Sequence, residues 1–260
     1  MKENINTLST RPTVLTIAGL DPSACAGILA DIKTLEAHKV NGMSVCTANT
    51  RQNVNKFEEP NWIKFDDILS QLNLLQKEKY FDFVKIGLIE NFLVLDKIID
   101  ELLSQNKSVK IIWDPICKAS AQFEFHKNID QKLLEIICSK LYLVTPNLNE
   151  IKLLVPGKIT DDACSYLAKF CNILLKGGHS TDNTSTDTLF IQKTIHRFKA
   201  NKLANFSKRG TGCVLSSAIL ANLANGQELI NACENAKKYI TNYLTSNDSQ
   251  IGYHNYETYK

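Results

Sequence analysis

Residues 13–38 of this 260-residue chain read TVLTIAGLDPSACAGILADIKTLEAH, which is a strand, a loop of small residues and a helix in succession. Thr13–Gly19 is rich in β-branched and apolar residues and closes on a glycine, a pattern typical of a buried strand. Ile28–His38 repeats its apolar residues at the spacing of one helical face. The order strand, loop, helix is the building unit of a parallel sheet.

The same alternation continues along the chain. The predicted strands are Ser44–Ala48, Phe83–Gly87, Val109–Trp113, Leu141–Thr145, Asn172–Leu175 and a hairpin of Thr188–Gln192 with Ile195–Lys199. The predicted helices are Phe65–Lys77, Asn91–Ser104, Ile129–Cys138, Asp161–Phe170, Cys213–Ala224 and Gln227–Leu244, with a further helix start after Pro146. This order predicts an α/β fold with a mostly parallel central sheet and helices on both faces. Since no linker interrupts it, we expect a polar tail over residues 1–12 and a single domain over residues 13–260.

Composition and charge exclude several classes of protein. Hydrophobic residues make up 44% and charged residues 22%, which is typical of globular proteins and excludes intrinsic disorder. The 30 basic and 27 acidic residues leave a net charge of +3 without a basic block, so we expect no nucleic-acid partner. No apolar run approaches the ~20 residues of a membrane span, and no signal peptide is visible. We therefore expect a cytoplasmic protein without a membrane partner.

The cysteines and histidines predict neither disulfides nor structural zinc. Eight cysteines are scattered without a C-x-x-C pair, and most lie in apolar runs, where cysteine behaves as a small hydrophobe. In a reducing cytoplasm such thiols stay free. The five histidines are dispersed too, whereas a zinc site needs clustered ligands.

Residues that follow the strands are the candidates for a site, because ligands of open parallel sheets bind beyond the carboxyl ends of the strands. Asp21 and Ser23 either cap the next helix or lie beside a ligand, and the small residues up to Gly27 let a ligand approach the backbone. Asp114-Pro115 either holds a metal ion or caps a turn.

Two later segments leave similar alternatives open. Pro146-Asn147-Leu148-Asn149-Glu150 begins a helix, where Glu150 either complements the helix dipole or binds Mg²⁺. Lys176-Gly177-Gly178-His179 suits an anion close to the backbone, or is a turn with a solvated lysine. Neither interpretation is favoured by these segments alone.

Gly210-Thr211-Gly212-Cys213 opens an apolar helix and points most directly to a ligand. Its glycines expose backbone N–H groups at the positive end of a helix dipole, which suits a phosphate. The G-x-x-x-x-G-K-[ST] and G-x-G-x-x-G patterns are absent, so neither a P-loop nor a dinucleotide fingerprint is predicted. At the helix N-terminus we expect Cys213 to have a lowered pKa and thiolate character; alternatively it is a small residue tolerated at a tight helix start.

Taken together and in order, these segments resemble the ribokinase-like superfamily and, within it, the hydroxymethylpyrimidine/phosphomethylpyrimidine kinases of thiamine biosynthesis. The similarity runs from about Thr13 to about Leu244 and includes Ala26-Gly27-Ile28, Gly42-Met43-Ser44-Val45 and Gln52-Asn53. It implies a ribokinase-like fold and ATP-dependent phosphorylation of 4-amino-5-hydroxymethyl-2-methylpyrimidine and of its monophosphate, with Mg²⁺. Family members are commonly dimers, so the resemblance extends to a homodimer.

The resemblance also implies roles for individual residues. The pyrimidine is expected to contact Gly19, Asp21, Ala26, Gly27, Asp31, Thr50, Gln52 and Leu88, with the Gln52 amide offering both a donor and an acceptor. ATP is expected to contact Asn147, Lys176, Gly178, Gly210 and Gly212, and Mg²⁺ to be held by Glu150 and Asp114, with Asn147 beside them. The catalytic set is Lys176, Gly210, Thr211, Gly212 and Cys213, in which Cys213 takes the proton of the attacking hydroxymethyl oxygen.

The chain departs from the family pattern in several places. Ala24-Cys25 replaces two glycines, Ser207-Lys208-Arg209 replaces Asn-Thr-His, Val214 replaces a common threonine, and Ile116–Ser120 lacks the usual apolar pair. Arg209 either adds a phosphate contact or is solvated. These departures bear on the substrate and on turnover more than on the fold.

Three other functions stay open. A pyridoxal kinase has the same Gly-Thr-Gly-Cys ending and a hydroxymethyl acceptor, although Gln52 favours the pyrimidine. A non-catalytic module that senses the pyrimidine is disfavoured because the phosphate-binding residues are all present. A redox protein using Cys25 and Cys213 lacks a resolving-pair spacing.

Overall fold

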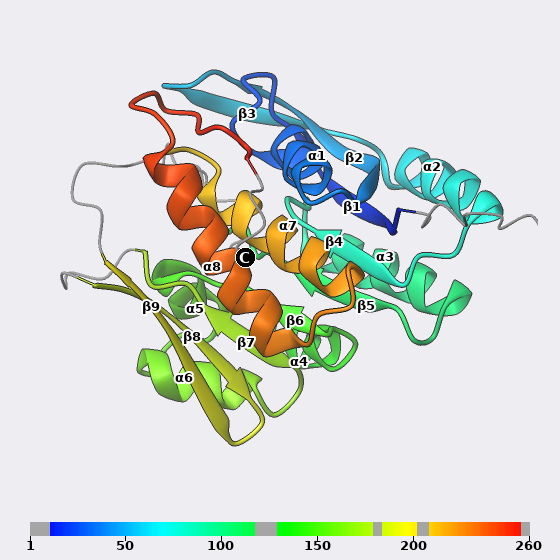
Figure 1. Cartoon of the computed structure of the whole chain (residues 1–260). Helices are drawn as coiled ribbons and strands as arrows, with labels where there is room; N and C mark the ends of the chain where they lie inside the picture. The colour runs from blue at the N-terminus through cyan, green and yellow to red at the C-terminus, as the bar shows by residue number, and fades with distance from the viewer. Residues whose placement is uncertain (1–10, 118–128, 179–183, 202–207, 256–260) are drawn as a thin grey trace, which may run out of the picture.

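The described residues of the computed structural model are 11–117, 129–178, 184–201 and 208–255. They form a nine-stranded sheet in the order β3-β2-β1-β4-β5-β6-β7-β8-β9 (Figure 1). The strands are β1 Thr13–Leu20, β2 Asn41–Gln52, β3 Phe57–Trp62, β4 Phe83–Ile86, β5 Lys110–Trp113, β6 Leu143–Val144, β7 Asn172–Leu175, β8 Thr184–Ile191 and β9 Thr194–Asn201. The helices are α1 Gly27–Ala37, α2 Phe65–Glu78, α3 Phe92–Gln105, α4 Gln131–Ser139, α5 Leu148–Leu154, α6 Thr160–Leu167, α7 Thr211–Ala224 and α8 Leu229–Thr245.

The central strands run parallel and the outer ones do not. β2, β1, β4, β5, β6 and β7 pair in parallel, whereas β3 pairs antiparallel with β2, and the β8–β9 hairpin pairs antiparallel with β7. The predicted α/β fold with a mostly parallel sheet is therefore confirmed. Because the parallel strands share a direction, the loops that follow them gather at one edge of the sheet.

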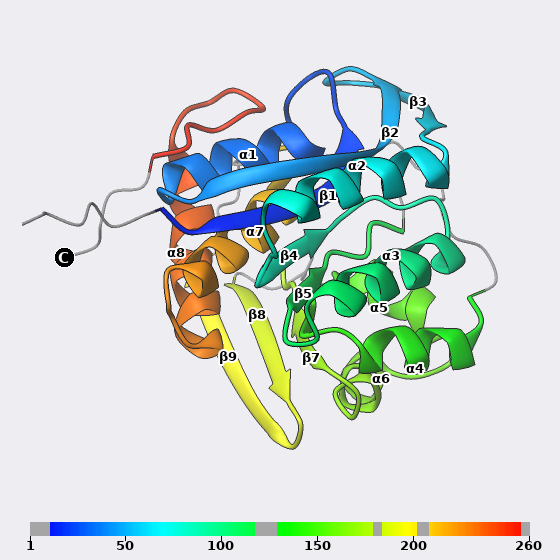
Figure 2. The same cartoon turned by 90° about the vertical axis from the view of Figure 1, so that its right-hand side faces the viewer.

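Each face of the sheet carries its own hydrophobic core. One core packs α2 to α6 against the sheet, and the other packs α1, α7 and α8 against the opposite face (Figure 2). Alternating strand residues serve the two cores: Leu15 and Ile17 belong to the first and Val14 to the second. Each such fully buried aliphatic side chain contributes roughly 1.5–3 kcal/mol of transfer free energy.

α7 is buried on all sides. Every residue from Cys213 to Leu223 is buried, because the helix is apolar around its whole circumference and lies between α1, α8 and the sheet. Because α7 is packed on all sides, its N-terminus is held in a fixed position. The Gly-Thr-Gly-Cys segment at that N-terminus is thereby held at the edge where the strand loops gather.

Strand β3 was not predicted from the sequence. It contains Glu58, Glu59 and Pro60, which are unfavourable in a central strand but tolerated at a sheet edge, and β3 pairs only with β2. The same pairing extends β2 to Gln52, well beyond the predicted Ser44–Ala48. The two glutamates and the proline interrupt the alternation of apolar and polar residues by which a strand is recognised in the sequence.

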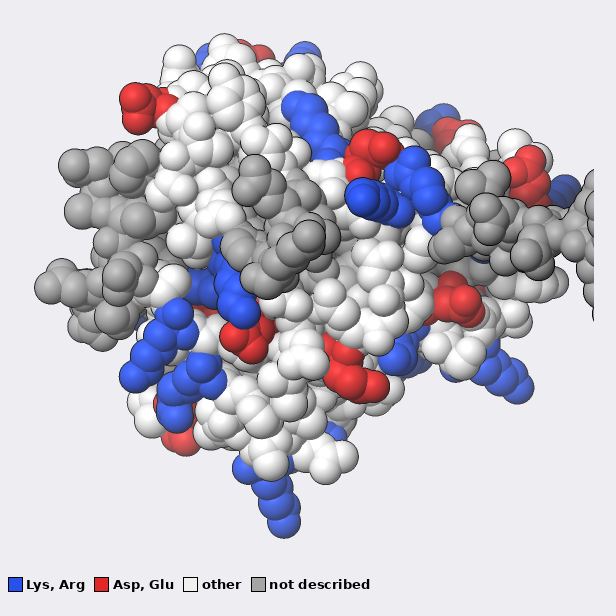
Figure 3. All heavy atoms as spheres, in the orientation of Figure 1, with Lys and Arg blue, Asp and Glu red and all other residues white. Residues whose placement is uncertain are grey.

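The surface carries charges of both signs. Basic and acidic side chains are interspersed on the face that carries α8 (Figure 3). In the part of the chain that the structure describes, no helix combines the length and apolarity that a bilayer span requires. All eight cysteines are free thiols, including the buried Cys25 and Cys213.

Candidate active site

Asp114, Glu150 and Lys176 meet at the carboxyl edge of the sheet. Asp114 directly follows β5, Lys176 follows β7, and Glu150 lies in the first turn of α5. The Nζ atom of Lys176 lies 2.7 Å from Asp114 Oδ1 and 3.5 Å from Glu150 Oε2. All three residues are buried, so the alternative of a solvated lysine is wrong. The structure thus brings three residues together that the sequence offered as separate candidates.

Burial and mutual charge set the protonation of this cluster. Burial raises the pKa of Asp114, but Lys176 and Lys85 outweigh it and hold that pKa below its ordinary value. Burial raises the pKa of Glu150 to about 7 against the opposing effect of Lys176. Burial lowers the pKa of Lys176, yet Asp114 and Glu150 bring it above its ordinary value. At neutral pH Asp114 is therefore a carboxylate, Lys176 is an ammonium, and Glu150 is near the midpoint of its titration.

Asp114 and Glu150 fit a magnesium ion as a pair of carboxylates. Mg²⁺ in phosphate-binding sites usually takes one or two carboxylates and completes its shell with water and phosphate oxygens. Thr145 Oγ1 and Ser216 Oγ donate to the two oxygens of Asp114 at 3.1 and 3.2 Å and so orient this carboxylate. Among the residues described, no cluster of three or more His, Cys, Asp or Glu side chains could hold a metal by itself. The two carboxylates therefore suit a cation that is also bound by the phosphate groups of a ligand.

Asn147 serves the start of α5. Its side-chain oxygen accepts from the backbone N–H groups of Asn149 and Glu150, each at 2.9 Å. The Glu150 carboxylate accepts in return from the Asn147 N–H at 2.7 Å, which completes a capping box. The acceptor oxygen of Asn147 is thus committed to the helix, and its contact with ATP stays a prediction.

The first turn of α7 abuts the Lys176–Asp114 pair. A Cβ atom on Gly212 would lie 3.3 Å from Lys176 Nζ and 3.7 Å from Asp114 Oδ2. Gly210 is the N-cap at φ +70°, and a Cβ there would lie 1.8 Å from the Cys25 carbonyl oxygen, so only glycine fits. The structure therefore brings the glycines of the predicted anion site beside the predicted phosphate-binding lysine.

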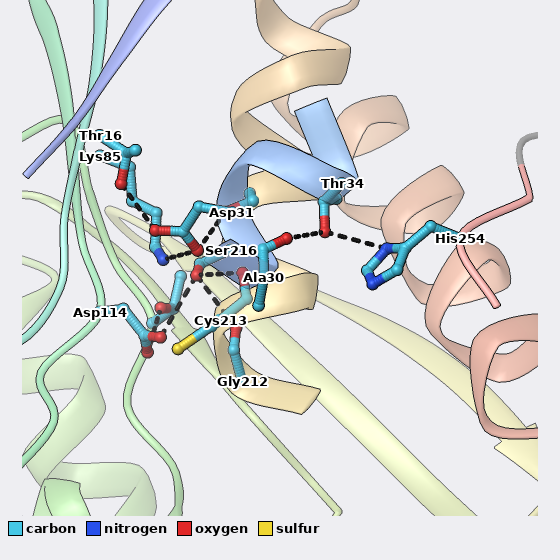
Figure 4. Close-up of polar contacts among 12 residues, drawn as sticks. Thr16, Ala30, Asp31, Thr34, Lys85, Asp114, Gly212, Cys213, Ser216 and His254 are labelled. Carbon is cyan, nitrogen blue, oxygen red and sulfur yellow. Dashed lines mark hydrogen bonds and ion pairs between the residues drawn. The ribbon is translucent and has the colours of Figure 1, made fainter. Parts of the chain in front are cut away.

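Cys213 is a buried thiol, which corrects the expectation of a lowered pKa. Burial raises the pKa of Cys213 to about 11, and the carboxylates of Asp31 and Asp114 add to the rise. Lys85 and the Gly27 N–H oppose it without overcoming it. The position at a helix N-terminus, from which a lowered pKa was expected, does not offset the cost of removing the thiolate from water. Figure 4 shows Cys213 in the first turn of α7, with Asp114 nearby.

Asp31 lies in the protein interior and has no exposed surface, which corrects its assignment to the substrate. Its carboxylate pairs with Lys85 Nζ at 2.5 Å and accepts from Thr16 Oγ1 at 2.6 Å (Figure 4). Ser217 Oγ donates to it at 2.8 Å. Sequence reasoning missed Lys85, although a lysine inside the apolar strand β4 is a signal, because a buried ammonium requires a buried partner.

Four of the predicted acceptor-site residues lie together near the end of β1. A Cβ on Gly19 would lie 2.9 Å from Leu88 Cδ2, so Gly19 and Leu88 are in contact. Thr50 Oγ1 donates to the Leu20 carbonyl at 2.8 Å, and Gln52 Nε2 donates to Thr50 Oγ1 at 2.9 Å. The Gln52 side chain is only partly buried. Its placement beside β1 agrees with the predicted grouping.

The loop between β1 and α1 is organised by Asp21. The Asp21 carboxylate is nearly fully buried and accepts from the Ser23 N–H at 2.9 Å and the Ala26 N–H at 3.0 Å. Asp21 therefore organises the loop and does not cap α1, whose N-cap residue is Ala26 and which has no side-chain cap. The contact of Asp21 with the substrate stays a prediction. The backbone of Ala26 and Gly27 lies close to the end of β1. Gly27 has φ +59°, and a Cβ there would lie 2.2 Å from the Gly19 carbonyl oxygen.

The segment after β7 also depends on glycine. A Cβ on Gly177 would lie 1.9 Å from the Thr186 carbonyl oxygen, and the Gly177 N–H donates to Asp187 Oδ1 at 2.8 Å. Gly178 is exposed, with open space around the position of a Cβ. His179 and Ser207, which belong to two of the predicted motifs, lie outside the described residues.

The guanidinium of Arg209 is engaged by backbone carbonyl oxygens, so the alternative of a solvated side chain is wrong. Its guanidinium donates to the carbonyl oxygens of Asn53, at 2.9 Å, and Val54, in the turn between β2 and β3. The neighbouring Lys208 is buried and donates to the carbonyl oxygens of Asn247 and Ser249, each at 2.7 Å. Both residues that replace family positions are thus anchored to other segments of the chain.

Comparison with known proteins agrees with this architecture. In solved structures, the chain is similar to a pyridoxal kinase from Staphylococcus aureus in complex with ADP, with a TM-score of 0.83 at 22% identity over 96% of both chains. It is also similar to a phosphomethylpyrimidine kinase from Clostridium difficile, with a TM-score of 0.74 at 29% identity over 89% of this chain and 98% of the other. The ribokinase-like fold implied by the resemblance is confirmed.

The sequence comparison is more specific. The chain is 34% identical to the hydroxymethylpyrimidine/phosphomethylpyrimidine kinase of Aquifex aeolicus over 246 residues, which is 92% of this chain and 96% of the relative. The sequence profile described as phosphomethylpyrimidine kinase matches residues 21–259, and so spans every residue of the cluster around Lys176 and Cys213. On both grounds, the chain belongs to the phosphomethylpyrimidine kinase family.

Proposed function

We propose that this protein transfers the terminal phosphoryl group of ATP to 4-amino-5-hydroxymethyl-2-methylpyrimidine and then to the monophosphate that this step produces. The observation that carries the proposal is the meeting of Lys176, Asp114 and the first turn of α7. A relative that carries the name of this activity, matched over nearly its whole length, supports it. The active unit is one kinase domain over residues 13–260.

Phosphate binding falls to α7 and Lys176. The backbone N–H groups of the first turn of α7 donate to phosphoryl oxygens, and the helix dipole favours their negative charge. Lys176 brings a buried ammonium that stays protonated at neutral pH and adjoins Gly212. Donors fixed in place before the reaction stabilise charge without reorganising, which is the main demand of phosphoryl transfer.

Asp114 and Glu150 are the residues that would hold magnesium. A magnesium ion held there would supply positive charge that neutralises part of the charge on the phosphate oxygens. Asp114 is ionised and oriented by Thr145 and Ser216, so it is ready to bind a cation. Glu150, with a pKa of about 7, would be the second carboxylate to hold the cation, in its deprotonated form.

The acceptor lies between the end of β1 and the β2–β3 hairpin. Leu88 and the bare backbone of Gly19 offer an apolar surface to the ring, and the Gln52 amide offers a donor and an acceptor to the aminopyrimidine. The hydroxymethyl oxygen attacks the terminal phosphorus, the bond from that phosphorus to the ADP oxygen breaks, and the hydroxyl proton passes to ionised Cys213 Sγ. Because the transition state is loose, this proton leaves late in the reaction.

The decisive test is ATP turnover with Mg²⁺, offering the pyrimidine and pyridoxal side by side and identifying the products by mass spectrometry. We expect the pyrimidine monophosphate and then the diphosphate, and no activity in Lys176→Met. A preference for pyridoxal would contradict the acceptor while keeping the chemistry, because pyridoxal also presents a hydroxymethyl group on a six-membered heteroaromatic ring. Pyrimidine binding without turnover would identify a sensor instead of an enzyme.

Two wider features belong to the same proposal. We place the enzyme in the cytoplasm, which is supported by eight free thiols and the use of ATP. The homodimer implied by the resemblance stays a prediction. Size-exclusion chromatography with light scattering tests it, and a mass near 29.2 kDa would contradict it.

A further inference from the structure

Arg209 links the β2–β3 hairpin to the N-terminus of α7. Its side chain reaches the carbonyl oxygens of Asn53 and Val54, while its own backbone directly precedes Gly210, the N-cap of α7. A guanidinium on carbonyl oxygens makes charge-assisted hydrogen bonds, which are shorter and stronger than neutral ones. The link therefore joins the element that carries Gln52 to the element that is proposed to bind phosphate.

The backbone on both sides of this link is well fixed. In the turn, the Asn53 N–H donates to the Lys56 carbonyl at 2.8 Å, and the Asn53 side chain accepts from the Lys56 N–H at 2.8 Å. On the other side, the Arg209 N–H donates to the Gln250 carbonyl at 3.1 Å. Lys208 fastens the same segment to the region after α8. A side chain held between two rigid supports transmits the position of one to the other.

The contacts close into a ring around the proposed acceptor site. From the turn, Gln52 donates to Thr50, and Thr50 donates to the Leu20 carbonyl. From Leu20, the following loop reaches Cys25, whose carbonyl oxygen lies where a Cβ of Gly210 would be. Arg209 completes the circuit from Gly210 back to the turn.

We propose that Arg209 is a positioning residue that couples acceptor binding at the β2–β3 hairpin to phosphate binding at the N-terminus of α7. The proposal rests on the proposed function for the identity of the two ligands. It predicts that each ligand binds more tightly in the presence of the other, because either one orders the ring that both need. Arg209 itself touches neither ligand.

The first test needs no ligand. Arg209→Met removes the guanidinium, and Arg209→Lys keeps the charge without the planar donor fork. Arg51→Met is the matched control, because Arg51 lies on the same hairpin and pairs with the exposed Glu59. Amide hydrogen exchange at residues 53–56 should become faster in Arg209→Met and stay as in the wild type in Arg51→Met. Equal exchange in all three proteins overturns the proposal.

The second test measures the coupling. Calorimetry gives the affinity for the pyrimidine with and without AMP-PCP and Mg²⁺, and steady-state kinetics gives both KM values. In Arg209→Met we expect the pyrimidine KM to rise roughly tenfold, the effect of losing a charge-assisted hydrogen bond, and the coupling factor to fall towards one. The ATP KM should change less than twofold, and Arg209→Lys should recover part of the loss. An unchanged coupling factor, or equal losses for both ligands, overturns the proposal.

Failure of the proposed function would look different. If the wild-type protein neither binds nor phosphorylates the pyrimidine, the calorimetry is repeated with pyridoxal, and the exchange experiment still reports on the link. A different pair of results contradicts the coupling role. In that case, exchange is faster in Arg209→Met, but the wild-type protein shows no coupling between AMP-PCP and either acceptor.

Discussion

Cys213 stays protonated at neutral pH, although the proposed reaction needs its thiolate. Cys213→Ser should lower turnover by roughly 10²–10⁴-fold, the usual contribution of a general base, while leaving pyrimidine binding nearly unchanged. Because the pKa of Cys213 is about 11, wild-type turnover should also rise with pH, by about tenfold per unit well below that value. Stopped-time assays between pH 7 and 10 measure both effects.

Two controls accompany this prediction. Cys233→Ser changes another buried cysteine, on α8, and should keep the wild-type pH profile. A wild-type rate that is flat across this range, or a Cys213→Ser variant with full activity, would remove Cys213 from the chemistry and leave only its packing role at the start of α7.

At the scale of single residues, the sequence predicted which residues lie near the site better than it predicted their burial and their pKa values. Asp114 and Lys176 were singled out because they follow strands, and Gly212 because it opens a helix, and the structure brings these three residues together. The sign of the pKa shift at Cys213 was wrong, because burial depends on the packing of α1 and α8 over the site. Asp31 was misassigned because its partner Lys85 lies 54 positions away in the chain. Such pairings are invisible to local spacing.

At the scale of elements, most helices and strands were predictable, including the largely exposed β9, whereas β3 was not. The predicted Asn172–Leu175 agrees with β7, and the predicted Phe65–Lys77 differs from α2 by a single residue. β3 escaped notice because Pro60 and two glutamates obscure its pattern, and β6 pairs over only Leu143–Val144. Apolar periodicity is the main signal of a strand, so a strand interrupted by a proline and two glutamates leaves little of it.

The packing of the C-terminal segment on α8 should be sensitive to acid. The His254 ring lies 4.8 Å from that of Tyr243, and its Nδ1 lies 3.1 Å from the Tyr239 hydroxyl. Burial lowers the pKa of His254 to about 4 from 6.5. A lowered pKa in the folded state gives stability that is present above pH 6.5 and is lost as pH falls towards 4.

Replacing this histidine should therefore flatten the acid limb of the stability curve. His254→Gln removes the titrating group and should lose less of its unfolding free energy than the wild type between pH 6.5 and 4, measured by urea denaturation. His196→Gln, in strand β9, is the control. Parallel curves for the wild type and His254→Gln would show that the segment does not contribute.

At the scale of the whole molecule, the site joins two cores. Glu150 belongs to α5 on one face of the sheet, and Cys213 belongs to α7 on the other. The ionisation of a site residue should therefore change the free energy of unfolding of the whole domain. The sequence predicted the class of this sheet from the strand–helix alternation. The resemblance, and not the pattern, supplied its ribokinase-like form, since strand order depends on pairings between distant segments.

The free energy of unfolding should depend on pH through the ionisation of Glu150. Its pKa is raised in the folded state from 4.5 to about 7, so it contributes stability that is present below pH 4.5 and is lost as pH rises through 7. Relative to Glu150→Gln, the wild-type Tm should fall as pH rises from 4.5 to 7, measured by scanning calorimetry. Glu90→Gln, at an exposed position, should follow the wild type. Identical profiles for all three proteins would mean that Glu150 ionises freely.

The buried Lys85–Asp31 pair restricts how this protein can evolve. Removing either partner alone leaves an uncompensated charge in the core, which typically costs about 3–5 kcal/mol, whereas replacing both together with apolar residues is often neutral. A cost of this size takes a substantial part of a typical stability margin of ~5–15 kcal/mol in the single step. A lineage that drops this pair therefore has to cross a fitness valley, and the two positions are expected to be inherited or exchanged as a unit.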